Sequence, residues 1–491
     1  MSSRAVFWSA AAAALAVGIL VAWHYAALDL TLSHYDAKGH LVVARRILDS
    51  LRPGWWQIGA VWLPLPHLLN MGPVQVDAWY RTGFSGVAIS VTSFALAVGA
   101  LAWLVHRATG SIAGALAGAF VLASQPDVLY LQSTPMTEPL LIALTLGGVA
   151  LTWQWAAANG AGSTAGAGTL LALACLTRYE AWPITAAAIG AAALVLATSG
   201  QPLDRSARRI GMLALYPIVA GLAFLLLSRA TVGSWLVTEG FFVPDNPDYH
   251  RPFKSIGSVW WGLVQLNGLR TVWLGVAALA LVVWTAWRDP ARRALIVTFA
   301  LAGCAALPVY AFYNGHPFRI RYMVVLTMTL AVTSGLGVGL VPRLVQPIAA
   351  AVVVAAALYD TPPLSPTAPM VTEAQWDHAH SVGRQVVRGC LARERHGEPI
   401  LASMGSLAHL MQETAADGIR IRDYIHEGIG QVWTDSLEHP ERHAGWVLIE
   451  EQAEGGDLLS ARRRDQPDFL SHFDRVCEGG GVALYRRRTA P

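Results

Sequence analysis

Four short polar segments of this chain carry the residue types that could do chemistry, and each interrupts long apolar sequence. The first spans residues 33–40 and follows directly on an apolar run over 5–27. Its Asp36 and His40 stand four residues apart and share a face if the segment is helical. Ionisable groups at a membrane boundary are costly to hold without a partner or a function. We therefore expect Asp36 to serve the activity of the protein.

The other three segments lie at the ends of later apolar runs, on the side of the membrane that we assign to Asp36. Because each is short, its side chains are held near the membrane surface and can converge if the helices bundle. The candidates are Glu138 in the second segment, Arg178, Tyr179 and Glu180 in the third, and His316, Arg319, Arg321 and Tyr322 in the fourth.

These residue types together predict one kind of reaction. A carboxylate such as Asp36 can take a proton from a hydroxyl acceptor, and Glu138 is a second catalytic candidate. Nearby arginines can hold a phosphate and stabilise the charge that develops as it leaves. Lys38 and His40 are candidates for orienting the substrate or facing its phosphate. A phosphate tethered to a lipid is presented at this depth, so we expect glycosyl transfer from a polyprenyl-phosphate sugar, with inversion at the anomeric carbon.

Each candidate also has a purely structural interpretation. Asp36 could only pair with a neighbouring cation, and Glu138 could favour the positive N-terminus of a helix. Arg178 and Glu180 could form a plain ion pair. The arginines of the fourth segment could bind lipid headgroups in general.

The elements that must position these residues are membrane helices. The chain has 491 residues, of which 54% are hydrophobic and only 14% charged, and its mean hydropathy is +0.43. The apolar residues fall in helix-length blocks, as in a polytopic membrane protein. We predict an all-α bundle of about eleven transmembrane helices, at 5–27, 84–105, 111–130, 138–157, 164–177, 181–198, 210–228, 269–287, 294–313, 322–341 and 344–359.

Charged residues between the spans predict the orientation of the bundle. With Arg4 in the cytoplasm, the alternate loops there are short and basic, as the positive-inside rule expects. The opposite side also holds many arginines and lysines, which goes against that rule. An anionic ligand at the outer surface is the simplest reason. We expect a multi-pass protein of the bacterial inner membrane with a cytoplasmic N-terminus.

The chain divides into a membrane module over 1–360, a linker over 361–371 and an extracytoplasmic α/β domain over 372–491. Inside the module, the outer loop 28–83 is interrupted by proline and rich in tryptophan, so we expect interfacial helices on the bilayer. A second outer segment, 229–268, is expected to be a loop. The α/β domain is predicted from strand-like runs alternating with helix-like ones, and 467–476 is expected to be helical.

Four cysteines are few for a chain of this length. Cys390 and Cys477 fall in the extracytoplasmic domain, where a disulfide between them is a hypothesis that sequence alone does not settle. No spacing of candidate ligands demands a metal, so no metal or other cofactor is predicted. Asp36, His40 and Glu138 would supply carboxylate and imidazole ligands if a divalent ion bound.

The order of the motifs resembles that in the GT-C superfamily of integral membrane glycosyltransferases. Within that superfamily, it is most similar to bacterial relatives of the protein O-mannosyltransferases and aminoarabinose transferases. The resemblance covers about residues 5–360. It implies that Asp36 occupies the catalytic-base position and that Arg178, Arg319 and Arg321 lie near the lipid phosphate. Many relatives carry two adjacent acidic residues in the first loop, whereas Asp36 stands alone here. That departure leaves the choice between base and metal ligand open.

Two other functional classes stay open. One is a flippase or transporter of lipid-linked glycans, which would favour charges midway along spans and internal repeats. The other is a non-catalytic glycan-binding or assembly protein. The expected partners are a polyprenyl-phosphate-linked sugar, membrane lipids and a glycan, lipid or protein acceptor. Nucleic acid is not expected, because the chain has no basic tail and no nucleic-acid-binding motif.

Overall fold

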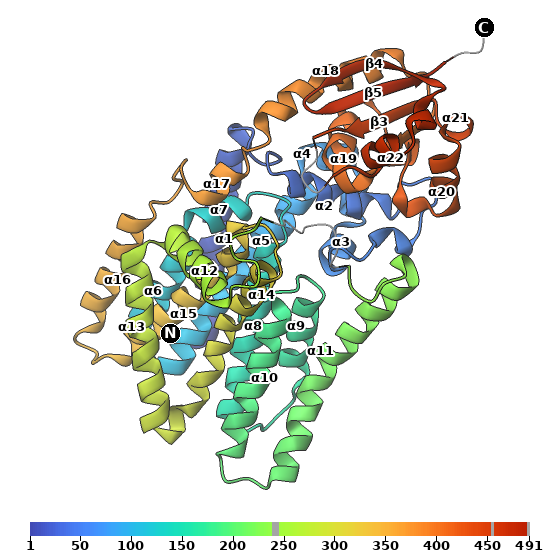
Figure 1. Ribbon diagram of the computed structural model, residues 1–491. Helices are drawn as coiled ribbons and strands as arrows, with labels where there is room; N and C mark the ends of the chain where they lie inside the picture. Colours follow the sequence, from blue (N-terminus) through green and yellow to red (C-terminus); the bar gives the residue numbers. More distant parts are fainter. Residues whose placement is uncertain (238–244, 453–455, 489–491) are drawn as a thin grey trace.

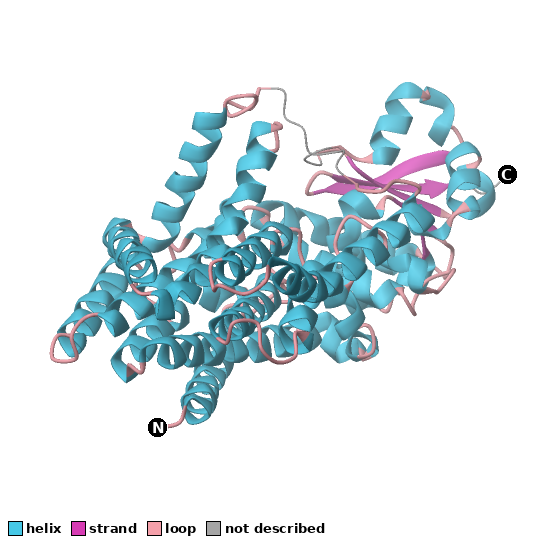
Figure 2. Cartoon of the chain, turned by 90° about the horizontal axis from the view of Figure 1, so that it is seen from below, coloured by secondary structure: helices cyan, strands magenta, loops and turns pink. Residues whose placement is uncertain are grey.

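The computed structural model describes residues 1–237, 245–452 and 456–488, and it contains a large helical bundle with a small sheet at one end (Figure 1). In the view of Figure 2 the strands lie to the right of the main helical bundle, with further helices beside them. The fold class is therefore the predicted one, a helical membrane bundle with a C-terminal α/β domain.

Helices occupy all eleven predicted spans, which lie within the described ranges. They are α1 (Ser3–Ala27), α5 (Phe84–Thr109), α6 (Ile112–Ala123), α8 (Glu138–Ala157), α9 (Ala165–Cys175), α10 (Ala181–Ala197), α11 (Leu203–Val232), α13 (Leu269–Arg288), η3 with α14 (Pro290–Tyr313), η4 with α15 (Ile320–Leu340) and α16 (Gln346–Asp360). Among the described residues, seven of these segments are long and apolar enough to cross a membrane, and α6, α9, α10 and α16 are shorter.

The central helix of the bundle is α15 (Thr327–Leu340), which is buried along almost its whole length. It packs against α6, α13 and α5. Glycines let α6 and α15 approach closely, because an added Cβ at Gly335 would lie 2.9 Å from the Gly114 carbonyl oxygen. The 3₁₀ segment η4 (Ile320–Leu326) leads into α15, so this close packing fixes the part of the chain that carries Arg321.

The first outer loop is built around helix α2 (Tyr35–Arg46), which begins earlier than its apolar residues suggest. His34 caps the helix, since its Nδ1 accepts a hydrogen bond from the Asp36 backbone N–H at 3.1 Å. The capped start brings Asp36 and His40 onto one helical face. The rest of the loop holds η1 (Trp55–Ile58), α3 (Leu65–Asn70), η2 (Pro73–Gln75) and α4 (Asp77–Thr82).

Part of the second outer segment is helical, so the expectation of a loop over 229–268 is wrong there. Helix α12 (Pro252–Asn267) begins at a proline, which is favoured in the first turn of a helix. Its buried Val259, Gly262 and Leu266 form a stripe that packs on η4 and α14. Residues 238–244 of the expected loop lie outside the described residues.

The described part of the C-terminal region contains one five-stranded sheet, in the order β2-β1-β3-β5-β4. Strand β1 (Ile400–Ala402) runs parallel to β2 (Tyr424–Ile425) and β3 (Trp446–Glu450). Strand β5 (Val482–Arg487) is antiparallel to β3 and β4 (Phe473–Gly479). The helices around it are α18 (His378–Glu394), α19 (Met404–Glu413), η5 (Thr414–Asp417), η6 (Ile421–Asp423), η7 (Glu427–Ile429), α20 (Gln431–Glu438), α21 (Pro440–His443), α22 (Leu458–Asp465) and η8 (Pro467–Leu470). The short helix α17 (Pro369–Glu373) precedes them and packs on α7 (Pro126–Leu131) and η4 of the bundle.

Strand β4 lies where the sequence predicts the second half of a helix. The helix expected over 467–476 ends early, because η8 stops at Leu470 and β4 begins at Phe473. β4 lies at an edge of the sheet and all its residues after Phe473 are at least partly exposed, so its sequence lacks the apolar alternation of a half-buried strand.

Helix α2 lies under the C-terminal domain. Leu41 and Val42 share one hydrophobic core with Leu407 and Met411 of α19 and with Leu484 of β5. The expectation of helices lying on the bilayer did not include this contact. The sheet, α19 and α2 therefore form a single packed unit above the membrane helices.

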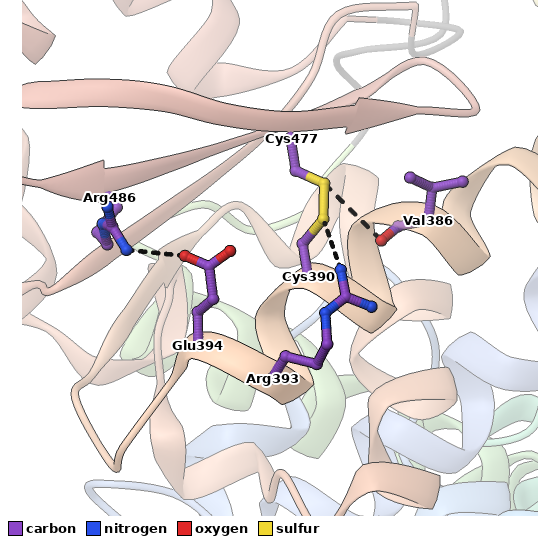
Figure 3. The surroundings of a disulfide bond; sticks show 6 residues. All are labelled: Val386, Cys390, Arg393, Glu394, Cys477 and Arg486. Carbon is purple, nitrogen blue, oxygen red and sulfur yellow. Dashed lines mark hydrogen bonds and ion pairs between the residues drawn. A yellow bond between two sulfur atoms is a disulfide. The ribbon is translucent and has the colours of Figure 1, made fainter.

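A disulfide joins Cys390 of α18 to Cys477 of β4 (Figure 3), as the sequence hypothesis proposed. Beside it, Glu394 of α18 pairs with Arg486 of β5 at 2.8 Å. Both links tie α18 to the sheet, and they stabilise the face on which α19 and α2 pack.

Candidate active site

Asp36 forms an ion pair with Arg321, which brings the first outer loop to the start of the last buried span. Both side chains are largely buried. Burial alone would raise the pKa of the Asp36 carboxyl, but the positive charge of Arg321 holds it well below its usual value. Asp36 is therefore ionised under ordinary conditions.

Arg178 is the centre of a second ionic group, in the turn between α9 and α10. Its Nη2 lies 2.6 Å from Glu180 Oε1, its Nη1 lies 2.8 Å from Glu138 Oε1, and Nη1 also donates to Thr137 Oγ1 at 3.1 Å. The contact with Glu138 is an ion pair without hydrogen-bond geometry, and neither carboxylate oxygen of Glu138 has a hydrogen-bond partner in the described structure. Burial opposes the charge of Arg178, but Glu138 and Glu180 raise its pKa above its ordinary value.

The two ionic groups adjoin at His40. Burial lowers the pKa of His40 well below its ordinary value, and the charges of Arg178 and Arg321 act in the same direction. Its Nδ1 lies 3.1 Å from His67 Nε2. The structure thus brings together Asp36, His40, Glu138, Arg178, Glu180 and Arg321, all of them candidates from the sequence.

Arg321 has one donor that no described protein group uses. Its Nη1 pairs with Asp36 without hydrogen-bond geometry, and its buried Nε has no partner among the described residues. Buried donors without acceptors are costly. A ligand with acceptor oxygens would remove that cost.

The remaining candidates of the fourth segment lie beside this cluster. The Tyr322 hydroxyl is 3.4 Å from His316 Nε2, and their rings are 5.5 Å apart. Arg319 is half-buried at the start of η4.

Two predicted site residues point elsewhere. Lys38 Nζ is 2.6 Å from Glu413 Oε1, so it reaches the C-terminal domain rather than the arginines. Its place on α2 explains this, because residue 38 lies on a different face from residues 36 and 40. Tyr179 packs on Trp182 and Phe224, and its hydroxyl donates to the Ala60 carbonyl at 3.4 Å.

Three residues of the site were not among the sequence candidates. Thr137 directly precedes Glu138 in the sequence, and His67 lies in the tryptophan-rich loop. In the sequence, each is only a polar side chain without a motif around it. Glu373 of α17 lies 3.5 Å from His34 Nε2. It follows the last span, where nothing in the sequence connects it with α2.

Among the described residues, no three His, Cys, Asp or Glu side chains gather in a way that could hold a metal ion. Metal independence stays a prediction.

Solved structures with the same fold exist, although no family model and no curated protein matches the chain. ArnT from Cupriavidus metallidurans bound to undecaprenyl phosphate aligns with 97% of this chain and 98% of its own, at a TM-score of 0.59 and 12% identity. The same protein in the apo state aligns over 95% and 97%, at 0.58 and 13%. ArnT is an aminoarabinose transferase of the GT-C type. The chain thus has a GT-C fold resembling that of ArnT, as the order of its motifs predicts.

Proposed function

We propose that this protein is an inverting glycosyltransferase. It moves a sugar from a polyprenyl-phosphate donor to an acceptor on the outer face of a bacterial inner membrane. The observation that carries the proposal is Arg321, a buried guanidinium whose Nη1 contacts the carboxylate Asp36 while its Nε has no partner among the described residues. The ArnT fold, solved with undecaprenyl phosphate, supports a lipid of this class.

The donor phosphate binds to the arginines in this mechanism. Arg321 offers its unused Nε, and its Nη1 would be shared between Asp36 and a phosphate oxygen, since a guanidinium can match two phosphate oxygens at once. Arg178 is held in place by Glu138 and Glu180 and adds a second positive charge near the same point. Both charges stabilise the phosphate as it leaves.

Asp36 is the base. It removes the proton from the acceptor hydroxyl while that oxygen attacks the anomeric carbon. The bond from the anomeric carbon to the phosphate oxygen breaks, and its electron pair leaves with the polyprenyl phosphate. One displacement inverts the anomeric centre. In the resting protein the ion pair with Arg321 makes Asp36 a weak base, and a phosphate that shares Arg321 would raise the pKa of Asp36.

Asp36→Asn tests this function. The variant should lose transfer by at least a hundredfold, the lower range for a general base, and should still bind undecaprenyl phosphate, since both arginines remain. Lys254→Gln, on the amphipathic helix α12, is a control that should keep full activity. Full activity of Asp36→Asn would exclude Asp36 as the base.

A further inference from the structure

A small cavity adjoins the candidate site on the side of His40. Its volume is about 20 Å³, room for a single water-sized group. Its polar lining comes from His40, His67, Asn70 and Thr137, which belong to α2, α3 and the residue before α8. Arg178 donates to Thr137, so the cavity touches the arginine cluster.

The hydrogen bonds of the two histidines determine which ring nitrogens carry protons. His67 Nδ1 lies 3.2 Å from the Leu63 carbonyl oxygen, which can only accept, so Nδ1 carries the proton. Burial, with Arg46 nearby, lowers the pKa of His67 to about 3, so its Nε2 is an acceptor. That acceptor receives its hydrogen bond from His40 Nδ1 at 3.1 Å.

His40 is neutral for the same reason, since burial lowers its pKa well below the ordinary value. With its proton on Nδ1, its Nε2 is left as an acceptor, and no described residue donates to that atom. Trp62 packs on the imidazole with ring centroids 4.1 Å apart, which holds the orientation of the ring.

Asn70 contributes a second unused acceptor. It is 94% buried, being 6% exposed, and its Oδ1 has no hydrogen-bond partner in the described structure. Two acceptors around a space for one small group match a hydrogen-bond donor. A phosphate has acceptor oxygens and would be repelled, whereas a sugar hydroxyl donates.

We infer that His40 Nε2 and Asn70 Oδ1 form a subsite that accepts a hydrogen bond from a hydroxyl of the transferred sugar, and that His40 is not a phosphate ligand. The inference rests on the proposed function and deepens it. The sugar is bonded directly to the phosphate, so a subsite with two unused acceptors beside the arginines faces the carbohydrate. Of the two roles expected for His40, the inference keeps that of orienting the substrate and excludes that of facing its phosphate.

Two substitutions of His40 separate the roles of its nitrogens. In His40→Asn, the amide NH₂ takes the place of Nδ1 and still donates to His67, but the acceptor at Nε2 is lost. In His40→Gln, the longer side chain returns an acceptor near the Nε2 position. The probes are undecaprenyl phosphate and a panel of undecaprenyl-phosphate monosaccharides, with binding measured in detergent or nanodiscs.

We expect both variants to bind bare undecaprenyl phosphate within twofold of wild type. For the panel member that wild type binds most tightly, His40→Asn should raise Kd by roughly three- to tenfold, the worth of one neutral hydrogen bond, and His40→Gln by less than twofold. Asn70→Leu should resemble His40→Asn. Equal weakening towards the bare lipid and the sugar-bearing lipid would make His40 a phosphate ligand and overturn the inference.

No change towards either lipid would mean that the cavity holds water alone, and would also overturn it. ¹⁵N-histidine NMR supplies a readout that does not depend on any sugar. His40 should be in the Nδ1–H form with and without undecaprenyl phosphate, and protonation of Nε2 on addition of the lipid would contradict the inference. If wild type binds neither bare nor glycosylated lipid, the proposed function itself fails.

Discussion

Arg321 determines how strongly Asp36 can act as a base. The carboxyl is buried, which alone would favour its neutral form, and the neighbouring guanidinium reverses that preference. Because the folded pKa of Asp36 is below its unfolded value, this ion pair stabilises the fold above the unfolded pKa. The stabilisation is lost as the pH falls through the folded pKa.

Removing the guanidinium of Arg321 should therefore move the acidic limb of the pH profile of activity. In Arg321→Gln, burial of Asp36 is no longer compensated, and the acidic limb of the kcat/KM profile should shift to higher pH by about one to three units. Undecaprenyl phosphate binding should weaken in the same variant. Arg321→Lys keeps a positive charge and should shift the limb less. An unchanged limb in Arg321→Gln would show that Asp36 is not the group that titrates.

Residues near the span boundaries could be recognised from the sequence because the topology places them on one surface. Asp36, Arg178 and Arg321 belong to three distant segments that all follow or precede an apolar run, and they converge as expected. Lys38 could not be assigned, since its partner Glu413 lies in another domain. His67 could not be assigned to the site either, because a lone histidine in a tryptophan-rich loop most often has a structural role.

At the scale of elements, the packing of α6 on α15 positions the segment that carries Arg321. An added methyl group at Gly335 would meet the Gly114 carbonyl and the Val105 side chain, at 2.9 and 3.0 Å. Gly335→Ala should therefore destabilise the protein by about 1–3 kcal/mol, seen as a lower Tm in detergent.

A glycine with open space around it provides the control. Gly211 of α11 has nothing within 4 Å of an added Cβ. Gly211→Ala should leave the Tm unchanged or raise it slightly, because alanine is the better helix former by about 1 kcal/mol. Equal losses of stability in both variants would exclude close packing as the cause.

Helices were easier to predict than strands. Each span is a long apolar block, and its type follows from length and composition alone. Strand β2 has only two residues, and the residues of β4 after Phe473 are all at least partly exposed. Neither strand therefore shows the alternation of apolar and polar residues that predicts a strand. The burial of α2 under the C-terminal domain depends on contacts between residues far apart in the chain, which a single sequence does not reveal.

At the scale of the whole molecule, the C-terminal domain holds the helix that presents Asp36. Tyr35 donates its hydroxyl to the Ser406 carbonyl at 2.8 Å, and Lys38 pairs with Glu413, which also lies 3.4 Å from Arg384. One face of α2 thus contacts α19 while another carries Asp36 and His40 towards the membrane helices.

A double-mutant cycle tests this connection. In Lys38→Met, Arg384 is the one cation that still contacts Glu413 among the described ion pairs. In Glu413→Gln, Lys38 is buried without its counter-charge. Each single change should lower both Tm and kcat, and the double variant should lose less than the sum, with a coupling of about 0.5–3 kcal/mol. Undecaprenyl phosphate affinity should be unchanged, since the arginines are untouched. Additive effects on Tm would show that the two side chains do not interact.

The core shared by α2 and the sheet also sets an order of events during synthesis. Leu41 and Val42 leave the ribosome among the first residues, whereas Val482 and Leu484, which complete the same core, are translated far later. The membrane helices can all be inserted while α2 still lacks its packing partners. We expect the nascent chain to be inserted but inactive until β5 has been translated and has packed beside β3. A stop codon just before β5 would then abolish activity without removing any span of the bundle.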